Sequence, residues 1–184
     1  MMGATIWTIG HSNRDLASFL DLLRPESIDV LADVRRFPGS RKHPQFSGEA
    51  LETGLAGAGI AYRHFAGLGG RRGKPAPGSP NVGWRVASFN AYADHMGSPE
   101  FRADFEELVA TAEGHRVALM CSEAVPWRCH RRLIADALVV RGWRVRDILG
   151  PRQVRDHALT PFARVDEGRL TYPAPPIISP GGGP

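Results

Sequence analysis

The sequence predicts a single α/β domain with a mostly parallel sheet of about five strands flanked by helices. Short apolar runs alternate along the chain with segments in which apolar residues recur at helical spacing. One run, residues 28–34, is almost continuously apolar, which is typical of a strand buried on both faces of a parallel sheet. The length of 184 residues suits one hydrophobic core and is short for two.

The first β-α-β unit is predicted from a strand, a helix and the apolar run described above. A β-prone run covers residues 5–9 and ends at Gly10. Asn13 is a suitable N-cap for a helix over residues 14–24, where leucines and Phe19 recur at helical spacing. This order predicts two parallel strands joined by a helix.

The alternation continues to residue 149. The predicted elements are, in chain order, a short helix that ends near residue 59, strand 60–64, helices 84–96 and 99–113, strand 117–121, helix 129–141 and strand 143–149. A loop rich in glycine and proline, residues 67–83, interrupts this order. Ser98 is the expected cap of the second of the paired helices.

The C-terminal part of the chain has a weaker pattern. Residues 1–150 are expected to form the α/β domain, and 151–172 an extension packed on it. Within this extension, Glu167 and Gly168 indicate the turn of a hairpin. Residues 173–184 are dominated by proline and glycine and are predicted to be a disordered tail.

Composition excludes several classes of protein. No apolar run approaches the ~20 residues of a membrane span, and no signal peptide is recognisable, so a cytoplasmic protein is expected. Two cysteines are too few for a disulfide scaffold and are therefore expected to act as thiols or ligands. The formal net charge of +4 is a small excess of 23 basic over 19 acidic residues. Charge alone therefore predicts no nucleic-acid binding, although all basic residues except Lys42 and Lys74 are arginine.

Polar side chains follow four of the predicted strands. His11 follows the first strand, Asp33 and Arg35 follow the second, His64 ends the third and Cys121 ends the fourth. Ligands of open α/β sheets bind beyond the carboxyl ends of the strands, where loops and helix N-termini converge. The sequence therefore predicts a site at this edge.

Cys121 is the first candidate nucleophile or redox thiol. It lies between a buried strand and the loop that opens the next helix, where backbone N–H groups favour a thiolate. The alternative is a small buried hydrophobic residue, and for Cys129 the two interpretations are equally supported. The candidate catalytic residues are Cys121 as thiolate, His130 or His11 as acid or base, and Asp33 or Glu123 as the group that orients a histidine or a cation.

The candidate ligand-binding residues are mainly cations and loop glycines. They are Arg35 and Arg131 as anion clamps, together with Cys129, Gly69, Gly70, Arg71, Asn81, Trp84 and Arg85. The loop 67–74 combines glycines with three cations, which suits phosphate, but it lacks the order of a P-loop, and a solvated loop is an equal alternative. Trp84 beside Arg85 offers an aromatic face for a planar ligand, or anchors its helix in the core.

The strand, cysteine and helix order resembles rhodanese-like sulfurtransferases and cysteine phosphatases, so rhodanese-like and flavodoxin-like arrangements are both compatible with the pattern. The resemblance is limited to fold and position. Six residues separate Cys121 from Arg128, Glu123 adds a negative charge, and Pro126 removes a donor.

Motifs spread over residues 6–148 resemble one family closely, the bacterial and archaeal domain of unknown function 488. The matching segments are Ile9-Gly10-His11-Ser12, Asp33-Val34-Arg35 with Pro38 and Ser40, Tyr62, Leu68-Gly69-Gly70, Phe89, Tyr92-Ala93-Asp94-His95-Met96, Ala118-Leu119-Met120-Cys121-Ser122-Glu123 and Cys129-His130-Arg131. Ser122 stands where the family usually has alanine. The resemblance implies no established activity.

Three functions are consistent with these residues. The leading hypothesis is a thiol-dependent transferase or hydrolase that acts on a small anionic or nucleotide-like ligand. The first alternative is a nucleic-acid-binding or DNA-repair accessory module that uses the arginines and Trp84. The second is a metal-binding protein with zinc or iron ligands, although standard metal-binding spacings are absent, so no metal site is assigned. These ligands would be Cys121, Glu123, Cys129 and His130, joined by His11 or His64. No cofactor and no oligomeric state follow from the sequence.

Overall fold

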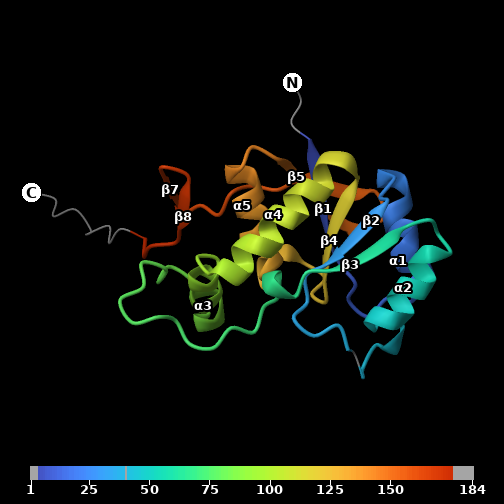
Figure 1. The fold of residues 1–184 in the computed structure, drawn as a ribbon, viewed down its shortest axis with the longest axis horizontal. Coiled ribbons are helices and arrows are strands. Elements are labelled where there is room, and N and C mark those ends of the chain that lie inside the picture. The colour runs from blue at the N-terminus through green and yellow to red at the C-terminus, as the bar shows by residue number, and fades with distance from the viewer. Residues whose placement is uncertain (1–3, 40, 176–184) are drawn as a thin grey trace, which may run out of the picture.

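A six-stranded sheet in the order β3-β2-β4-β1-β5-β6 forms the centre of the computed structural model, which describes residues 4–39 and 41–175 (Figure 1). The strands are β1 (Thr5–Gly10), β2 (Val30–Asp33), β3 (Ala61–His64), β4 (Val117–Cys121), β5 (Arg144–Gly150) and β6 (Gln153–Asp156). Neighbours among β1 to β5 pair in parallel, and β6 pairs antiparallel with β5. The predicted α/β class and mostly parallel sheet are confirmed. The strand order differs from the 2-1-3-4-5 order of flavodoxin-like sheets.

Helices cover both faces of the sheet. They are α1 (Leu16–Leu23), α2 (Gly48–Ala56), α3 (Ala87–His95), α4 (Pro99–Gly114) and α5 (Arg131–Val140). Phe19 of α1 and Leu51 of α2 belong to one buried cluster, whereas Leu108 of α4 and Leu133 of α5 belong to a second. None of the helices in the described part of the chain is long and apolar enough to cross a membrane.

Strand β4 shows how the alternation of side chains assigns residues to these two clusters. Leu119 and Cys121 lie in the cluster with α4 and α5, whereas Ala118 and Met120 lie in the cluster with α1 and α2. All five residues of the strand are buried. Cys121 therefore projects toward the face of the sheet that carries α5.

Three helix starts differ from the predictions, and one of them is that of α3, which begins at Ala87 rather than at residue 84. Helix α1 is capped by Asp15 rather than Asn13, because the Asp15 carboxylate accepts bonds from the Ser18 N–H at 2.8 Å and the Ser18 hydroxyl at 2.9 Å. Helix α5 begins at Arg131 rather than at residue 129. The predicted Ser98 cap of α4 is confirmed, since its hydroxyl accepts the N–H of Phe101 at 3.1 Å.

Residues 151–172 add a strand and a hairpin. The sixth strand, β6, is not among the predicted strands. The predicted hairpin is confirmed as β7 (Arg164–Asp166) and β8 (Arg169–Thr171), whose turn residues Glu167 and Gly168 both have positive φ. Tyr172 follows β8 and is fully buried. The predicted disordered tail begins at residue 173 and lies outside the described residues from 176 onward.

Candidate functional site

The carboxyl ends of β2, β4 and β1 lie side by side and form one wall of a pocket of about 380 Å³. The residues that line it are His11, Arg35, Arg36, Phe37, Gly39, His43, Gly70, Arg71, Ser88, Phe89, Tyr92, Cys121, Ser122, Glu123, Arg128, Cys129 and His130. The structure therefore brings together side chains from three of the four predicted strand ends.

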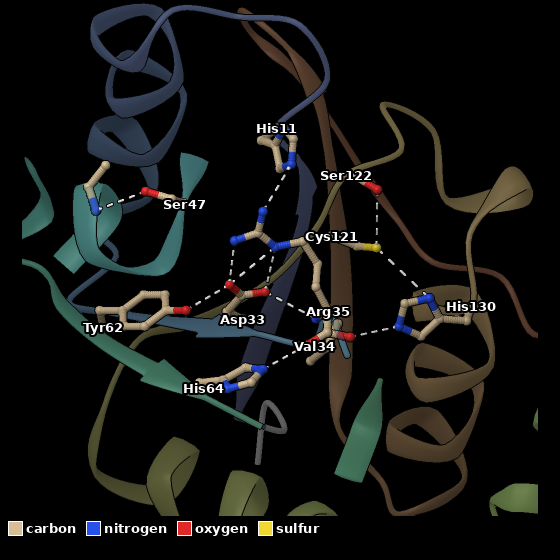
Figure 2. A network of polar contacts seen from close by, with 11 residues as sticks. His11, Asp33, Val34, Arg35, Ser47, Tyr62, His64, Cys121, Ser122 and His130 are labelled. Carbon is tan, nitrogen blue, oxygen red and sulfur yellow. Dashed lines mark hydrogen bonds and ion pairs between the residues drawn. The ribbon is translucent and has the colours of Figure 1, made fainter. Parts of the chain in front are cut away.

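Cys121 contributes a buried sulfur to this pocket (Figure 2). Its residue exposure is 5%, and its Sγ lies 3.8 Å from Nδ1 of His130 and 3.9 Å from Oγ of Ser122. Cys129 is equally enclosed, and its Sγ lies 3.7 Å from the same His130 nitrogen. His130 thus contacts both sulfurs.

The ring of His130 is fixed by a backbone carbonyl of a neighbouring strand. Its Nε2–H donates to the carbonyl of Val34 at 2.8 Å, which leaves the Nδ1 lone pair directed at the sulfur of Cys121 (Figure 2). Gly70 packs against this ring, and a Cβ at position 70 would lie 2.9 Å from Nδ1. Glycine is therefore required where the loop passes the imidazole.

The two cysteines have opposite protonation preferences. A hydrogen bond from Cys129, together with the charges of His130 and Arg131, holds the pKa of Cys121 well below its usual range although burial opposes this. Burial and the proximity of Cys121 raise the pKa of Cys129 well above its usual range. The N–H of Arg131, at the start of α5, points to Cys129 Sγ at 3.5 Å. The helix N-terminus thus contacts Cys129 instead of Cys121.

Asp33 and Arg35 form a buried ion pair at the end of β2. The guanidinium Nε lies 2.9 Å and Nη2 2.6 Å from the carboxylate oxygens of Asp33. The hydroxyl of Tyr62 also donates to Asp33, at 2.8 Å. These contacts hold the guanidinium of Arg35 so that its Nη1 points toward His11 and its side chain lines the pocket (Figure 2).

His11 is a neutral imidazole in this arrangement. Burial, assisted by the charge of Arg35, lowers the pKa of His11 to about 4. Its Nδ1–H donates to the carbonyl of Ser12 at 2.7 Å, so Nε2 is the acceptor that faces Arg35 at 3.4 Å. The ring stacks on Phe46 with 4.2 Å between centroids. His11 therefore accepts hydrogen bonds at neutral pH and has no proton to donate from Nε2.

Arg131, predicted as an anion clamp, is fully buried and does not line the pocket. Its guanidinium donates to the carbonyls of Glu123 and Ala124 and so holds the loop between the two cysteines. Gly10 touches the same loop from β1, because a Cβ at this position would overlap the carbonyl oxygen of Glu123. The position of the loop thus depends on both residues.

The remaining predicted site residues divide into two groups. Arg71 and Glu123 line the pocket with Gly70, and Gly69 packs against the backbone of Arg36. The others, namely Asn81, Trp84 and Arg85, are not among its lining residues.

Asn81 and Trp84 serve the packing of the protein interior. The side chain of Asn81 donates to Asp94 at 2.8 Å and accepts the N–H of Tyr172 at 2.9 Å. Trp84 is buried against Phe162 and Tyr172, with ring centroids 4.9 and 5.2 Å apart. Its faces are therefore occupied by protein groups.

Several pocket residues were not among the predicted site residues. They are Arg36, Phe37, Gly39, His43, Ser88, Phe89, Tyr92, Ser122 and Arg128. With Arg35 and Arg71, the pocket has four arginines and one glutamate among the described residues. The position of Arg36 and Arg128 next to predicted site residues is the sequence signal that points to them.

Only some of the residues predicted as possible metal ligands lie close together in the structure. Among residues 4–39 and 41–175, the donor atoms of Cys121, Cys129 and His130 lie within 4.8 Å of one another, and Glu123, His11 and His64 are not part of this group. His64 instead donates from Nε2 to the carbonyl of Arg35 at 2.8 Å.

A protein-family model matches most of the site, although His11 lies before the matched residues. The family described as Domain of unknown function DUF488 matches residues 15–138, more than half of the chain. The chain belongs to this family. The matched segment of the DUF488 domain includes β2, β4 and the start of α5, and it ends before β5. Comparison with curated proteins and with solved structures gives no significant match.

Proposed function

We propose that this protein is an enzyme that uses Sγ of Cys121 as a nucleophile toward a small anionic substrate. The observation that carries the proposal is the position of Cys121 in the pocket wall, 3.8 Å from His130 Nδ1, while the opposite nitrogen of that ring is held by the carbonyl of Val34. A sulfur and an oriented base in one pocket are the elements of nucleophilic catalysis by cysteine.

The chemistry follows from these two groups. The proton of the Cys121 thiol passes to Nδ1 of His130, and the sulfur forms a bond to the electrophilic centre of the substrate. The leaving group departs with the electron pair of the broken bond and takes the proton from His130. Transfer of the bound group to a second acceptor gives a transferase, and transfer to water gives a hydrolase.

The charge of the pocket supports an anionic substrate. Arg35 is compensated by Asp33, but no carboxylate among the described residues forms an ion pair with Arg71 or Arg128. Only Glu123 opposes them in the pocket lining. A pocket of about 380 Å³ is at the small end of the range for ligand sites.

The test compares an anionic and a neutral alkylating reagent on reduced, chelator-treated protein. We expect iodoacetate to modify Cys121 at least about 10-fold faster than Cys129, as measured by peptide mass spectrometry. The ratio of the iodoacetate to the iodoacetamide rate at Cys121 should exceed that of free cysteine. Arg128→Gln should lower this ratio, and Arg85→Gln, which removes an exposed arginine outside the pocket lining, should not.

Two results would count against the proposal. Equal modification of both cysteines would remove the special role of Cys121. An identical ratio of the two alkylation rates in the Arg128→Gln and Arg85→Gln proteins would show that Arg128 does not attract anions to the thiol of Cys121.

A further inference from the structure

The donor atoms of Cys121, Cys129 and His130 form a tighter group than a nucleophile and its base require. All three lie within 4.8 Å of one another, and all three residues line the pocket. We propose that these side chains bind a soft divalent metal ion such as Zn²⁺, with the fourth coordination position facing the pocket. This inference rests on the geometry of the three ligands and does not depend on the proposed nucleophilic function.

The distances agree with tetrahedral zinc coordination. Bonds of about 2.3 Å to sulfur and about 2.0 Å to nitrogen place a sulfur and a nitrogen ligand about 3.5 Å apart. Nδ1 of His130 lies 3.8 Å from Cys121 Sγ and 3.7 Å from Cys129 Sγ. The two sulfurs lie within 4.8 Å, so they need to approach by about 1 Å at most to reach the tetrahedral separation of about 3.8 Å.

The surrounding hydrogen bonds orient the ligands as metal sites require. A histidine ligand usually donates its other ring N–H to a carbonyl or carboxylate, which fixes the ring and directs the lone pair at the metal. His130 does so with the carbonyl of Val34 at 2.8 Å. The N–H of Arg131 points at Cys129 Sγ at 3.5 Å and would stabilise a thiolate there.

Charge and ligand type favour zinc over the hard cations. Two thiolates neutralise a divalent ion, so a neutral complex forms where Cys121 and Cys129 are 5% and 3% exposed. Sulfur and imidazole are ligands of zinc and its neighbours, whereas Mg²⁺ and Ca²⁺ select oxygen. Three protein ligands with one open position are the pattern of zinc sites that accept water or substrate.

Metal binding lowers the reactivity of Cys121 toward electrophiles. A thiolate that donates a lone pair to Zn²⁺ carries less negative charge and is a weaker nucleophile than the free thiolate. Zn²⁺ should therefore slow alkylation of Cys121, and a chelator should restore the rate.

The test uses Zn²⁺ alone, added to reduced apo-protein in competition with a chromophoric chelator. We expect one Zn²⁺ per chain and a loss of affinity of at least about 100-fold in each of Cys121→Ser, Cys129→Ser and His130→Gln. His64→Gln removes an imidazole at the same sheet edge and should leave the affinity unchanged. Circular dichroism confirms that each variant is folded. Co²⁺ in place of Zn²⁺ should give a thiolate charge-transfer band that is absent from the two cysteine variants.

The outcomes separate this inference from the proposed function. Binding of less than about one Zn²⁺ per ten chains, or equal affinity in the wild type and the three ligand variants, would overturn the metal site. Tight binding with unselective alkylation of the apo-protein would support the metal site and contradict the nucleophile. Selective alkylation of Cys121 without zinc binding would support the nucleophile and contradict the metal site. A slower reaction of Cys121 with iodoacetate in the presence of Zn²⁺ would support binding of the ion by this sulfur, and an unchanged rate would contradict it.

Discussion

Two of the buried polar clusters among the described residues contain a histidine in comparable surroundings, one at the carboxyl edge of the sheet and one between α5, β5 and the C-terminal extension. The first, the Cys121 cluster, consists of Cys121, Cys129 and His130. The second, the His157 cluster, consists of His157, Asp136, Asp147, Tyr172 and Thr8. Both contain a histidine between two groups that can carry negative charge.

The clusters differ in how many of their polar atoms form hydrogen bonds within the protein. Nε2 of His157 lies 2.9 Å from Asp136, and Nδ1 lies 3.1 Å from Asp147. The remaining carboxylate oxygens accept the hydroxyls of Tyr172 at 2.9 Å and Thr8 at 2.6 Å. In the Cys121 cluster the sulfurs instead line an open pocket. A cluster with all its partners supplied by the protein stabilises the fold, whereas one that faces a pocket has capacity left for a ligand.

Removal of a carboxylate from the His157 cluster should give the largest loss of stability. Asp136→Ala leaves His157 and the hydroxyl of Tyr172 buried without their shared acceptor. We expect the free energy of unfolding to fall by about 3–5 kcal/mol in urea denaturation. Asp166→Ala, on the exposed strand β7, should change it by less than about 0.5 kcal/mol. A similar small loss in both variants would show that the cluster is not a stabilising element.

The stability of the His157 cluster should depend on pH. Burial alone would lower the pKa of His157, but hydrogen bonds and charges from Asp136 and Asp147 raise it to about 9. Because the folded-state value exceeds the ordinary 6.5, the stabilisation is complete below pH 6.5 and is lost as the pH rises through 9. The loss is on the order of 3 kcal/mol, since each pKa unit corresponds to about 1.4 kcal/mol.

Urea denaturation between pH 6 and pH 10 measures this slope. His157→Gln should flatten the curve because the titrating group is absent. His130→Gln, in the other cluster, should retain the slope of the wild type. A slope that persists in His157→Gln would assign it to another group.

Removal of the sulfur from the Cys121 cluster should destabilise the protein less than the removal of Asp136 from the His157 cluster. Cys121→Ala deletes one small buried side chain, and we expect the free energy of unfolding to fall by about 1 kcal/mol. The same change should abolish the fast reaction with iodoacetate, measured by the mass of the labelled protein. If Cys121→Ala lowered the free energy of unfolding as much as Asp136→Ala, the main role of Cys121 would be packing in the hydrophobic core.

Most of the sheet follows from local sequence patterns. The five parallel strands are predicted to within about two residues. Strands β1, β2 and β4 are buried along most of their length and therefore appear as apolar runs, whereas β3 at the edge of the sheet is only partly buried. Strand β6 was not predicted, because Gln153–Asp156 is an edge strand and has no apolar run. Its one apolar residue, Val154, packs on the core. Asn13 and Asp15 are equally good capping residues, and their sequence does not distinguish between them.

The sequence predicts only those parts of the candidate site that lie at the ends of the strands. The expectation that side chains after parallel strands meet at one edge of the sheet grouped His11, Arg35 and Cys121, and all three line one pocket in the structure. The contact of His130 with the carbonyl of Val34 joins residues 96 positions apart and involves a backbone atom, so no local pattern encodes it. The burial of Arg131 likewise depends on the direction of its side chain within α5, toward the loop it supports.

The contact between Gly10 and the loop after β4 has a consequence for the inheritance of this site. Any other residue at position 10 must displace the carbonyl of Glu123, and with it the segment that joins the two cysteines. A missense change there would leave every pocket side chain unchanged and still displace the segment between Cys121 and Cys129. We therefore expect position 10 to tolerate as little variation among descendants of this sequence as Cys121 itself.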